Sequence, residues 1–247
     1  MTFSDDERQR YARHILLKEI GGPGQQRLKA ATVAIVGAGG LGAPAALYLA
    51  AAGIGRLRLI DDDRVSLDNL QRQVIFRSAD VGAAKVDRAQ AALAALNDNV
   101  SVEIESQRLT DANAAYLLQG ADVVLDGTDD FETRFAVNAA ARALGAPLVS
   151  GAVGRWDGQV ATFARGGPCY RCFVPETPPD VETCARVGVV GALTGVVGSI
   201  MALEAIKLIT QAGEPLIGRV MFFDGLSGDA RTVGLPRDPA CPVCANE

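Results

Sequence analysis

Histidine is almost absent from this chain, since His14 is the only one among 247 residues, and aromatic residues make up only 5%. A single histidine argues against a mechanism that needs a histidine base and against a histidine-rich metal site. An excess of basic residues is also lacking, because 24 Lys and Arg stand against 29 Asp and Glu, and the net charge is −5. Without a broad basic field, we expect no nucleic acid partner.

A secretory signal is lacking too, because the N-terminal sequence MTFSDDERQRYARH is charged and has no apolar core. Residues 30–55 and 188–209 are apolar enough to raise the question of a membrane span. The first stretch contains six glycines and a proline and divides into a strand and a helix, and the second contains Glu204 and Lys207. We therefore expect a cytoplasmic protein with no membrane segment, in which 188–209 is a helix buried against a sheet or a partner subunit.

The chain is organised around residues 33–61, which have the pattern of one βαβ unit. A β-branched run at 32–36 predicts a buried strand, a helix is expected over 41–52, and a second strand over 57–60 ends at Asp61. Between the first strand and the helix stands a G-x-G-G-x-G loop, formed by Gly37, Gly39, Gly40 and Gly42. Glycines allow close approach of a phosphate, the helix N-terminus attracts its charge, and the acid accepts hydrogen bonds from a ribose. The alternative is an ordinary glycine turn that permits close helix–sheet packing.

A polar segment follows at 61–85, at the carboxyl end of a strand, where open α/β sheets bind ligands. Its candidate binding residues are Asp63, Asn69, Arg72, Gln73 and Lys85. A nucleoside triphosphate with Mg²⁺ carries about four negative charges and calls for cations and for carboxylates that hold the metal. We expect Arg72 and Lys85 at the surface of the cleft as phosphate ligands, with a surface ion pair or a solvated face as the alternative.

The remaining pattern predicts an α/β fold, a Rossmann-like nucleotide-binding sheet with helices on both faces, continued by a mixed β and helix portion. Helices are expected at 4–20, where Ser4 and Glu7 form a capping box, and at 85–96, 111–119 and 131–144, with a glycine-rich break at 21–24. Further strands are expected at 100–105, 121–126, 147–152, 158–163, 219–224 and 230–233. The strand at 121–126 ends in a loop in which Asp129 is a candidate Mg²⁺ ligand, although Thr128, Asp129 or Asp130 also suits a helix cap.

Four of the five cysteines form two C-x-x-C pairs, Cys169 with Cys172 and Cys241 with Cys244. Two such pairs are the ligand set of a closed, structural Zn²⁺ site that ties the C-terminal tail to the body, with reduced thiols or a redox pair as the alternative. The fifth, Cys184, lies in a polar, proline-rich stretch at 174–187 and is a candidate for a covalent role, or a free thiol without a task.

The motifs RYARHILL, GAGGLGAP, LIDDDRVSLDNLQRQ, GAAK, DGTDD, PCYRC and CPVC occur in this order along the chain. Together they resemble the ubiquitin-activating-like adenylyltransferases, and within them the bacterial MoeB/ThiF/HesA group. The resemblance covers essentially the whole chain. It implies one adenylation domain over 1–247, with a nucleotide-binding half at about 28–150 and a carrier-binding and zinc half at about 151–247.

The resemblance also implies an activity, which is ATP-dependent adenylation of the C-terminal glycine carboxylate of a small ubiquitin-fold sulfur carrier ending in Gly-Gly. Pyrophosphate is released, and the pathway is molybdopterin or thiamine biosynthesis. By matching motif, Asp61 binds ribose, Asn69, Arg72, Gln73 and Lys85 bind phosphates, and Asp129 binds Mg²⁺. Arg13 reaches the triphosphate of a neighbouring subunit, which implies a homodimer. The alternatives are an NAD-dependent Rossmann oxidoreductase and a non-catalytic partner-binding scaffold.

Overall fold

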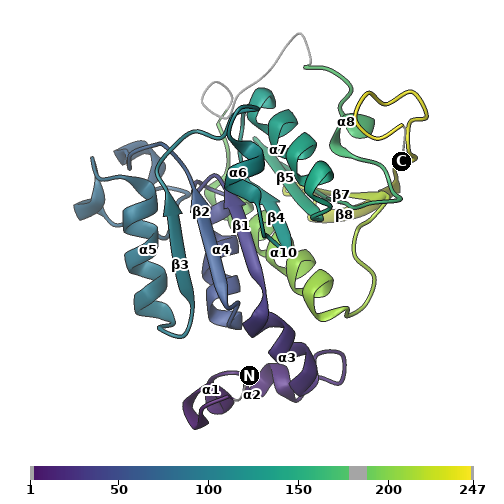
Figure 1. Cartoon of the computed structure of the whole chain (residues 1–247). Coiled ribbons are helices and arrows are strands. Elements are labelled where there is room, and N and C mark those ends of the chain that lie inside the picture. Colours follow the sequence, from purple (N-terminus) through teal and green to yellow (C-terminus); the bar gives the residue numbers. More distant parts are fainter. Residues whose placement is uncertain (1–2, 178–187, 246–247) are drawn as a thin grey trace.

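A computed structural model describes residues 3–177 and 188–245. Its centre is one eight-stranded sheet in the order β3-β2-β1-β4-β5-β6-β7-β8 (Figure 1). The strands are β1 Thr32–Val36, β2 Arg56–Ile60, β3 Ser101–Glu105, β4 Val123–Asp126, β5 Leu148–Gly154, β6 Asp157–Phe163, β7 Arg219–Asp224 and β8 Asp229–Gly234. Strands β1 to β5 pair in parallel, and β6, β7 and β8 continue the sheet by antiparallel pairing. Both predicted halves therefore share one sheet.

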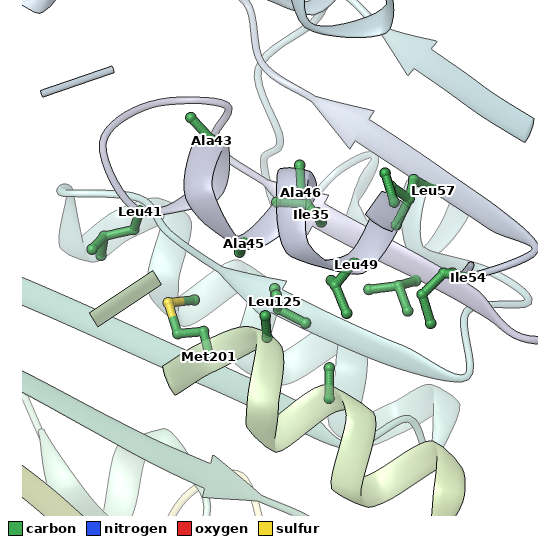
Figure 2. Close-up of a cluster of buried hydrophobic side chains, with 14 of the residues drawn as sticks. Ile35, Leu41, Ala43, Ala45, Ala46, Leu49, Ile54, Leu57, Leu125 and Met201 are labelled. Carbon is green, nitrogen blue, oxygen red and sulfur yellow. The ribbon is translucent and has the colours of Figure 1, made fainter. Parts of the chain in front are cut away.

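Helices cover both faces of the sheet, as predicted. The helices α4 Gly42–Ala52, α5 Lys85–Leu96 and α10 Gly191–Thr210 share one hydrophobic cluster, and α6 Ala114–Leu118 and α7 Phe131–Leu144 belong to the other. Strand β1 divides its side chains between the clusters, since Val33 and Ile35 enter the first and Ala34 and Val36 the second. Figure 2 shows part of the first cluster, to which Leu49 of α4, Met201 of α10 and Leu125 of β4 contribute.

Helix α10 is long and apolar enough to cross a membrane by length and composition. In this fold it packs on α4, β5 and β6, as the sequence predicts for a helix buried against the sheet. Gly151 and Gly158 make room for it, because a Cβ at either position would collide with Met201 or Val197. Its Glu204 is buried and accepts hydrogen bonds from Thr162 Oγ1 at 2.9 Å and Leu216 N at 2.6 Å.

The N-terminal region departs from the prediction of one helix followed by a break. Helix α1 Asp5–Arg10 begins with the predicted Ser4–Glu7 capping box, but α2 is only Ala12–Ile15, and α3 Gly21–Ala30 runs through the glycines. The interruption lies at Tyr11, whose buried ring fills the space above Gly53. Helix α3 forms despite poor propensity, because Gly24 lets it approach Ile20 and Thr210 closely and Pro23 stands in the first turn, where no N–H is needed.

The other elements agree with the prediction to within a few residues. Helix α6 is shorter than the predicted 111–119, because Asn113 accepts a hydrogen bond from Thr110 N at 2.8 Å and the helix starts after it. Short 3₁₀ turns η1 Leu67–Asn69 and η2 Ser78–Asp80 and helix α8 Tyr170–Phe173 complete the described elements.

Candidate nucleotide-binding site

A cavity of about 670 Å³ opens at the carboxyl ends of β1, β2 and β4. Ten of the predicted site residues line it, namely Gly37, Gly39, Gly40, Asp61, Asp63, Asn69, Arg72, Gln73, Lys85 and Asp129. They come from three strand-end loops that are far apart in the sequence. Parallel pairing brings these loops to one edge of the sheet, so the sheet itself assembles the cavity.

The glycine loop forms one wall of the cavity. Gly37 has φ +88, and a Cβ there would lie 3.2 Å from the Gly127 backbone. Within the described residues, no side chain caps the N-terminus of α4, so its first N–H groups suit a bound anion. Gly42 does not line the cavity, and a Cβ on it would overlap the Gly37 carbonyl oxygen. For Gly42, the geometry favours the packing alternative.

Asp61 is held by the backbone around it. Its Oδ2 accepts from Ala38 N at 2.7 Å, and its Oδ1 accepts from Asp63 N at 2.8 Å. Burial raises the pKa of this carboxyl above its ordinary value, although Lys85 and the two backbone donors oppose the shift. Each carboxylate oxygen accepts more than one hydrogen bond, so a ribose hydroxyl is still a possible donor to Asp61.

Lys85 lies deeper than the surface position expected from the sequence. Its side chain is only 6% exposed, and its Nζ lies 2.8 Å from Asp63 Oδ2. It is the first residue of α5, and its backbone N donates to Asp63 O, which turns the start of the helix into the cavity wall. Lys85 therefore lines the cavity as predicted, although its side chain is buried, while Arg72 is half-buried and donates to Asp68 O at 3.0 Å.

Gln73 and Asn69 are buried in the same wall. Gln73 is 4% exposed, and its Oε1 has no hydrogen-bond partner among the described residues. A buried polar atom without a partner is uncommon in folded proteins. Because Gln73 lines the cavity, a bound molecule is a natural partner for its amide.

The two acidic residues in the loop after β4, Asp129 and Asp130, make different contacts. Asp130 caps α7 by accepting from Thr133 N at 2.8 Å, and it pairs with Arg108 at 3.2 Å. Asp129 is exposed and lines the cavity. The capping alternative therefore applies to Asp130, which leaves the Asp129 carboxylate available to a metal.

Arg134 lines the cavity and was missed by the sequence analysis. It is 5% exposed and donates to Gly151 O at 2.9 Å and to Thr128 O. Burial lowers the pKa of its guanidinium, but Asp126 beside it reverses this effect, and the net pKa is raised. The available signal was its place on the inward face of α7, one turn before Val137 and two before Ala141.

The four paired cysteines meet although about 70 residues separate the two pairs. Their sulfurs lie within 4.8 Å of one another, with Cys169 and Cys241 at 3.6 Å and Cys172 and Cys244 at 3.4 Å. Tetrahedral Zn²⁺ with Zn–S bonds of about 2.3 Å places sulfurs roughly 3.8 Å apart, so the cluster fits the ion. Two donors also point at the sulfurs, Asn138 Nδ2 toward Cys169 and Asp238 N toward Cys172. The clustering confirms the predicted zinc knuckle.

One predicted residue lies elsewhere. Arg13 is exposed on α2, and α1 to α3 lie at the end of the sheet where β1 begins, away from the cavity at the opposite strand ends (Figure 1). Cys184 lies outside the described residues.

In a comparison with known protein families, the model of the ThiF family matches residues 11–243. The chain belongs to the ThiF family. It is 47% identical over 255 residues to a sulfur carrier protein adenylyltransferase of Thermus thermophilus, with all of this chain and 94% of the relative covered. It is also 47% identical over 248 residues to a SAMP-activating enzyme E1 of Haloferax volcanii, covering 99% of this chain and 92% of the relative.

Among solved structures, the ThiF-family fold of this chain is similar to that of E. coli MccB with ATP. The TM-score is 0.78 at 25% identity, and the match covers 90% of this chain and 68% of the other. The family resemblance and the α/β fold predicted from the sequence motifs are confirmed.

Proposed function

We propose that this ThiF-family chain is an adenylyltransferase. It activates the C-terminal glycine carboxylate of a small ubiquitin-fold sulfur carrier with ATP and releases pyrophosphate, in molybdopterin or thiamine biosynthesis. The names of its full-length relatives support this activity. The single observation that carries it is the cavity, in which a buried lysine, an arginine and the buried side chain of Gln73 face a glycine loop. An NAD oxidoreductase has no use for this set of phosphate ligands.

In this proposal different cavity residues bind different parts of the nucleotide. The glycine loop and the start of α4 receive phosphate oxygens, and Asp61 accepts from the ribose. Lys85, Arg72, Asn69 and Gln73 bind the β- and γ-phosphates. Lys85 is already held by Asp63 at 2.8 Å, so it is positioned before ATP binds. Asp129 would hold Mg²⁺, which would neutralise part of the phosphate charge when bound.

The reaction needs no general base. The glycine carboxylate of the carrier is ionised at neutral pH and attacks the α-phosphorus, while the bond to the pyrophosphate oxygen breaks. The chain holds the two reactants in line and stabilises charge on the leaving pyrophosphate through Lys85 and Arg72. A chain with one histidine, located outside the cavity, suits such a mechanism.

The carrier enters, we propose, from the second half of the chain. Tyr170, Phe173, Val174 and Val189 line the cavity on that side. The two terminal glycines of the carrier would fit along this apolar wall because they have no side chains. The chain then works as one adenylation domain, in which the halves at about 28–150 and 151–247 contribute the nucleotide site and the carrier site.

Pyrophosphate release with a purified carrier tests the activity. Wild-type protein with ATP, Mg²⁺ and a Gly-Gly-ended carrier should release pyrophosphate and form an acyl-adenylate. A carrier that lacks its last glycine is the matched control and should give neither product. A change in NADH absorbance instead would establish an oxidoreductase, and carrier binding without pyrophosphate would leave a scaffold.

The site is completed, in our proposal, by a homodimer. Arg13 is exposed and lies away from its own cavity, so it serves the cavity of a partner subunit or none. Arg13→Ala and Asp129→Ala should each be nearly inactive. In a heterodimer of the two variants, one site carries both lesions and the other neither, so about half the wild-type activity should return. Co-expression with two tags isolates the heterodimer, and a heterodimer as inactive as its parents contradicts the shared site.

Two further proposals concern the cysteines and the compartment. The paired cysteines hold Zn²⁺ as thiolates, which agrees with a cytoplasmic location, where thiols stay reduced. Cys184 is not needed for adenylation, and we expect its covalent role, if one exists, in sulfur transfer. Loss of acyl-adenylate in Cys184→Ala with zinc intact would contradict this.

A further inference from the structure

The zinc knuckle is joined to helix α7 by one buried amide. Asn138, which is 2% exposed, donates from Nδ2 to Cys169 Sγ at 3.7 Å and accepts from Tyr170 N at 2.8 Å. It therefore fixes both a metal-binding sulfur and the residue that follows it. The position of the first cysteine pair is thereby linked to the positions of α7 and Tyr170.

Tyr170 carries this connection from the knuckle to the cavity. Its ring is buried, packs against Phe135 and Phe163 at 5.9 Å, and lies 5.9 Å from the guanidinium carbon of Arg134. Tyr170 and Arg134 both line the cavity. A buried guanidinium against an aromatic face is held by electrostatic attraction and by close packing together.

Arg134 in turn holds the loop that bears Asp129. It donates to the Thr128 carbonyl, which belongs to the peptide group that leads into Asp129, and to Gly151 O on the neighbouring strand. Asp126, beneath the loop, accepts from Thr128 N at 3.0 Å and from Thr128 Oγ1 at 2.7 Å. Thr128 is thus held from both sides, and the position of Asp129 follows from the position of Arg134.

We propose that Asn138 and Tyr170 are positioning residues that transmit the state of the four-cysteine knuckle, through Arg134, to the Thr128–Asp129 loop. The knuckle then has a second task besides tying down the C-terminal tail. It orders the acidic side of the cavity, so that an empty knuckle leaves the loop loose. The proposed ordering of the loop does not depend on the proposed function, and only its consequence for nucleotide binding rests on that function.

Amide hydrogen exchange tests the loop without any nucleotide. In zinc-loaded protein, Tyr170→Leu should keep its metal and accelerate exchange at Gly127 and Thr128 about tenfold, because local opening sets the exchange rate. Tyr170→Phe keeps the ring and should accelerate it less. Segment 56–60, strand β2, which pairs with β1 and β3 and not with β4, should exchange as in wild type. Arg237→Ala is the matched control, because Arg237 donates to Cys244 O, in the second cysteine pair.

Removal of zinc gives the complementary result. In wild type, chelation should accelerate exchange at 127–128 more than at 56–60, and in Tyr170→Leu it should add little at 127–128. Equal acceleration of both segments in wild type, or normal exchange at 127–128 in Tyr170→Leu and Asn138→Ala, would overturn the proposal.

A calorimetric cycle tests the consequence for Mg²⁺. Tyr170→Leu should weaken binding of ATP with Mg²⁺ about fivefold and leave binding of ATP in EDTA unchanged. In the Asp129→Ala background, the same change should add nothing, because the effect passes through Asp129. Additive losses contradict the relay, whereas wild-type protein that binds no ATP contradicts the proposed function and leaves the exchange result intact.

Discussion

The parallel and antiparallel parts of the sheet differ in how deeply their strands are buried. Strand β4, in the parallel part, is buried at every residue, whereas β8, at the antiparallel edge, is exposed at every residue. Helices cover both faces of the parallel part, and its central strands β1 and β4 are nearly continuous apolar runs, with polar residues at their ends. The cavity therefore forms at the parallel part, where charged groups meet at the edge of a dry core.

Strands β6 and β7 of the antiparallel part also place side chains in both hydrophobic clusters, and discrete polar contacts and the two cysteine pairs add to this packing. Buried Glu204 binds the segment that leads into β7, and the C-terminal pair of cysteines follows β8 and returns to the first pair. Loss of the cysteine pairs should thus affect stability, and loss of a cavity residue in the parallel part should affect ligand binding.

The largest effect is expected at the knuckle. Cys172→Ser should lower zinc content and cost roughly 3 kcal/mol or more of stability, because a structural metal contributes folding free energy. Metal analysis and thermal unfolding measure the two together. Cys184→Ala is the control for loss of a thiol and should change neither. Freshly purified, reduced wild type without zinc would end this explanation.

A smaller effect, on function and not on folding, is expected in the parallel part. Lys85→Ala or Arg72→Ala should reduce pyrophosphate exchange at least about tenfold, or about 1.4 kcal/mol, through lost neutralisation of phosphate charge. Stability should change little, since Asp63, the partner of Lys85, is 68% exposed and is solvated when unpaired. Lys18→Ala, at an exposed site outside the cavity, is the control. Normal exchange in both cavity variants would remove the triphosphate site.

The smallest expected effect is on the pH dependence of stability, which should have opposite signs for Asp61 in the parallel part and Asp224 in the antiparallel part. Burial raises the folded-state pKa of Asp61 in the cavity, so its contribution to stability is greatest below the unfolded-state pKa of about 3.9 and falls as pH rises through the raised pKa. In the β7–β8 turn, the N–H groups of Leu226 and Ser227 lower the pKa of Asp224. Its contribution is present above about pH 3.9 and is lost as pH falls through the lowered pKa.

Unfolding free energies measured against pH test these signs. The differences between wild type and Asp61→Asn, and between wild type and Asp224→Asn, should slope in opposite directions. Slopes of the same sign would mean that the cavity does not desolvate Asp61.

The sequence by itself determined the elements whose signals are local. Buried runs predicted β1 and β4, the glycine loop predicted the turn into α4, and α7 was predicted with its bounds, because hydrophobic period and capping residues act over a few positions. The motif spacing likewise identified the candidates that line the cavity. Only the tertiary structure decided how deep they lie and what they contact.

Packing between residues far apart in the sequence determines the depth and the contacts of these residues. Lys85 is buried because α5 starts against Asp63, and Gly42 serves helix packing because the loop folds back on it. Helix α3 contains a glycine at Gly24, where a Cβ would lie 2.9 Å from Ile20. Arg134, Asn138 and Tyr170 meet through contacts between α7 and the knuckle, more than 30 residues apart in the sequence, and no pattern of neighbouring residues encodes such a contact.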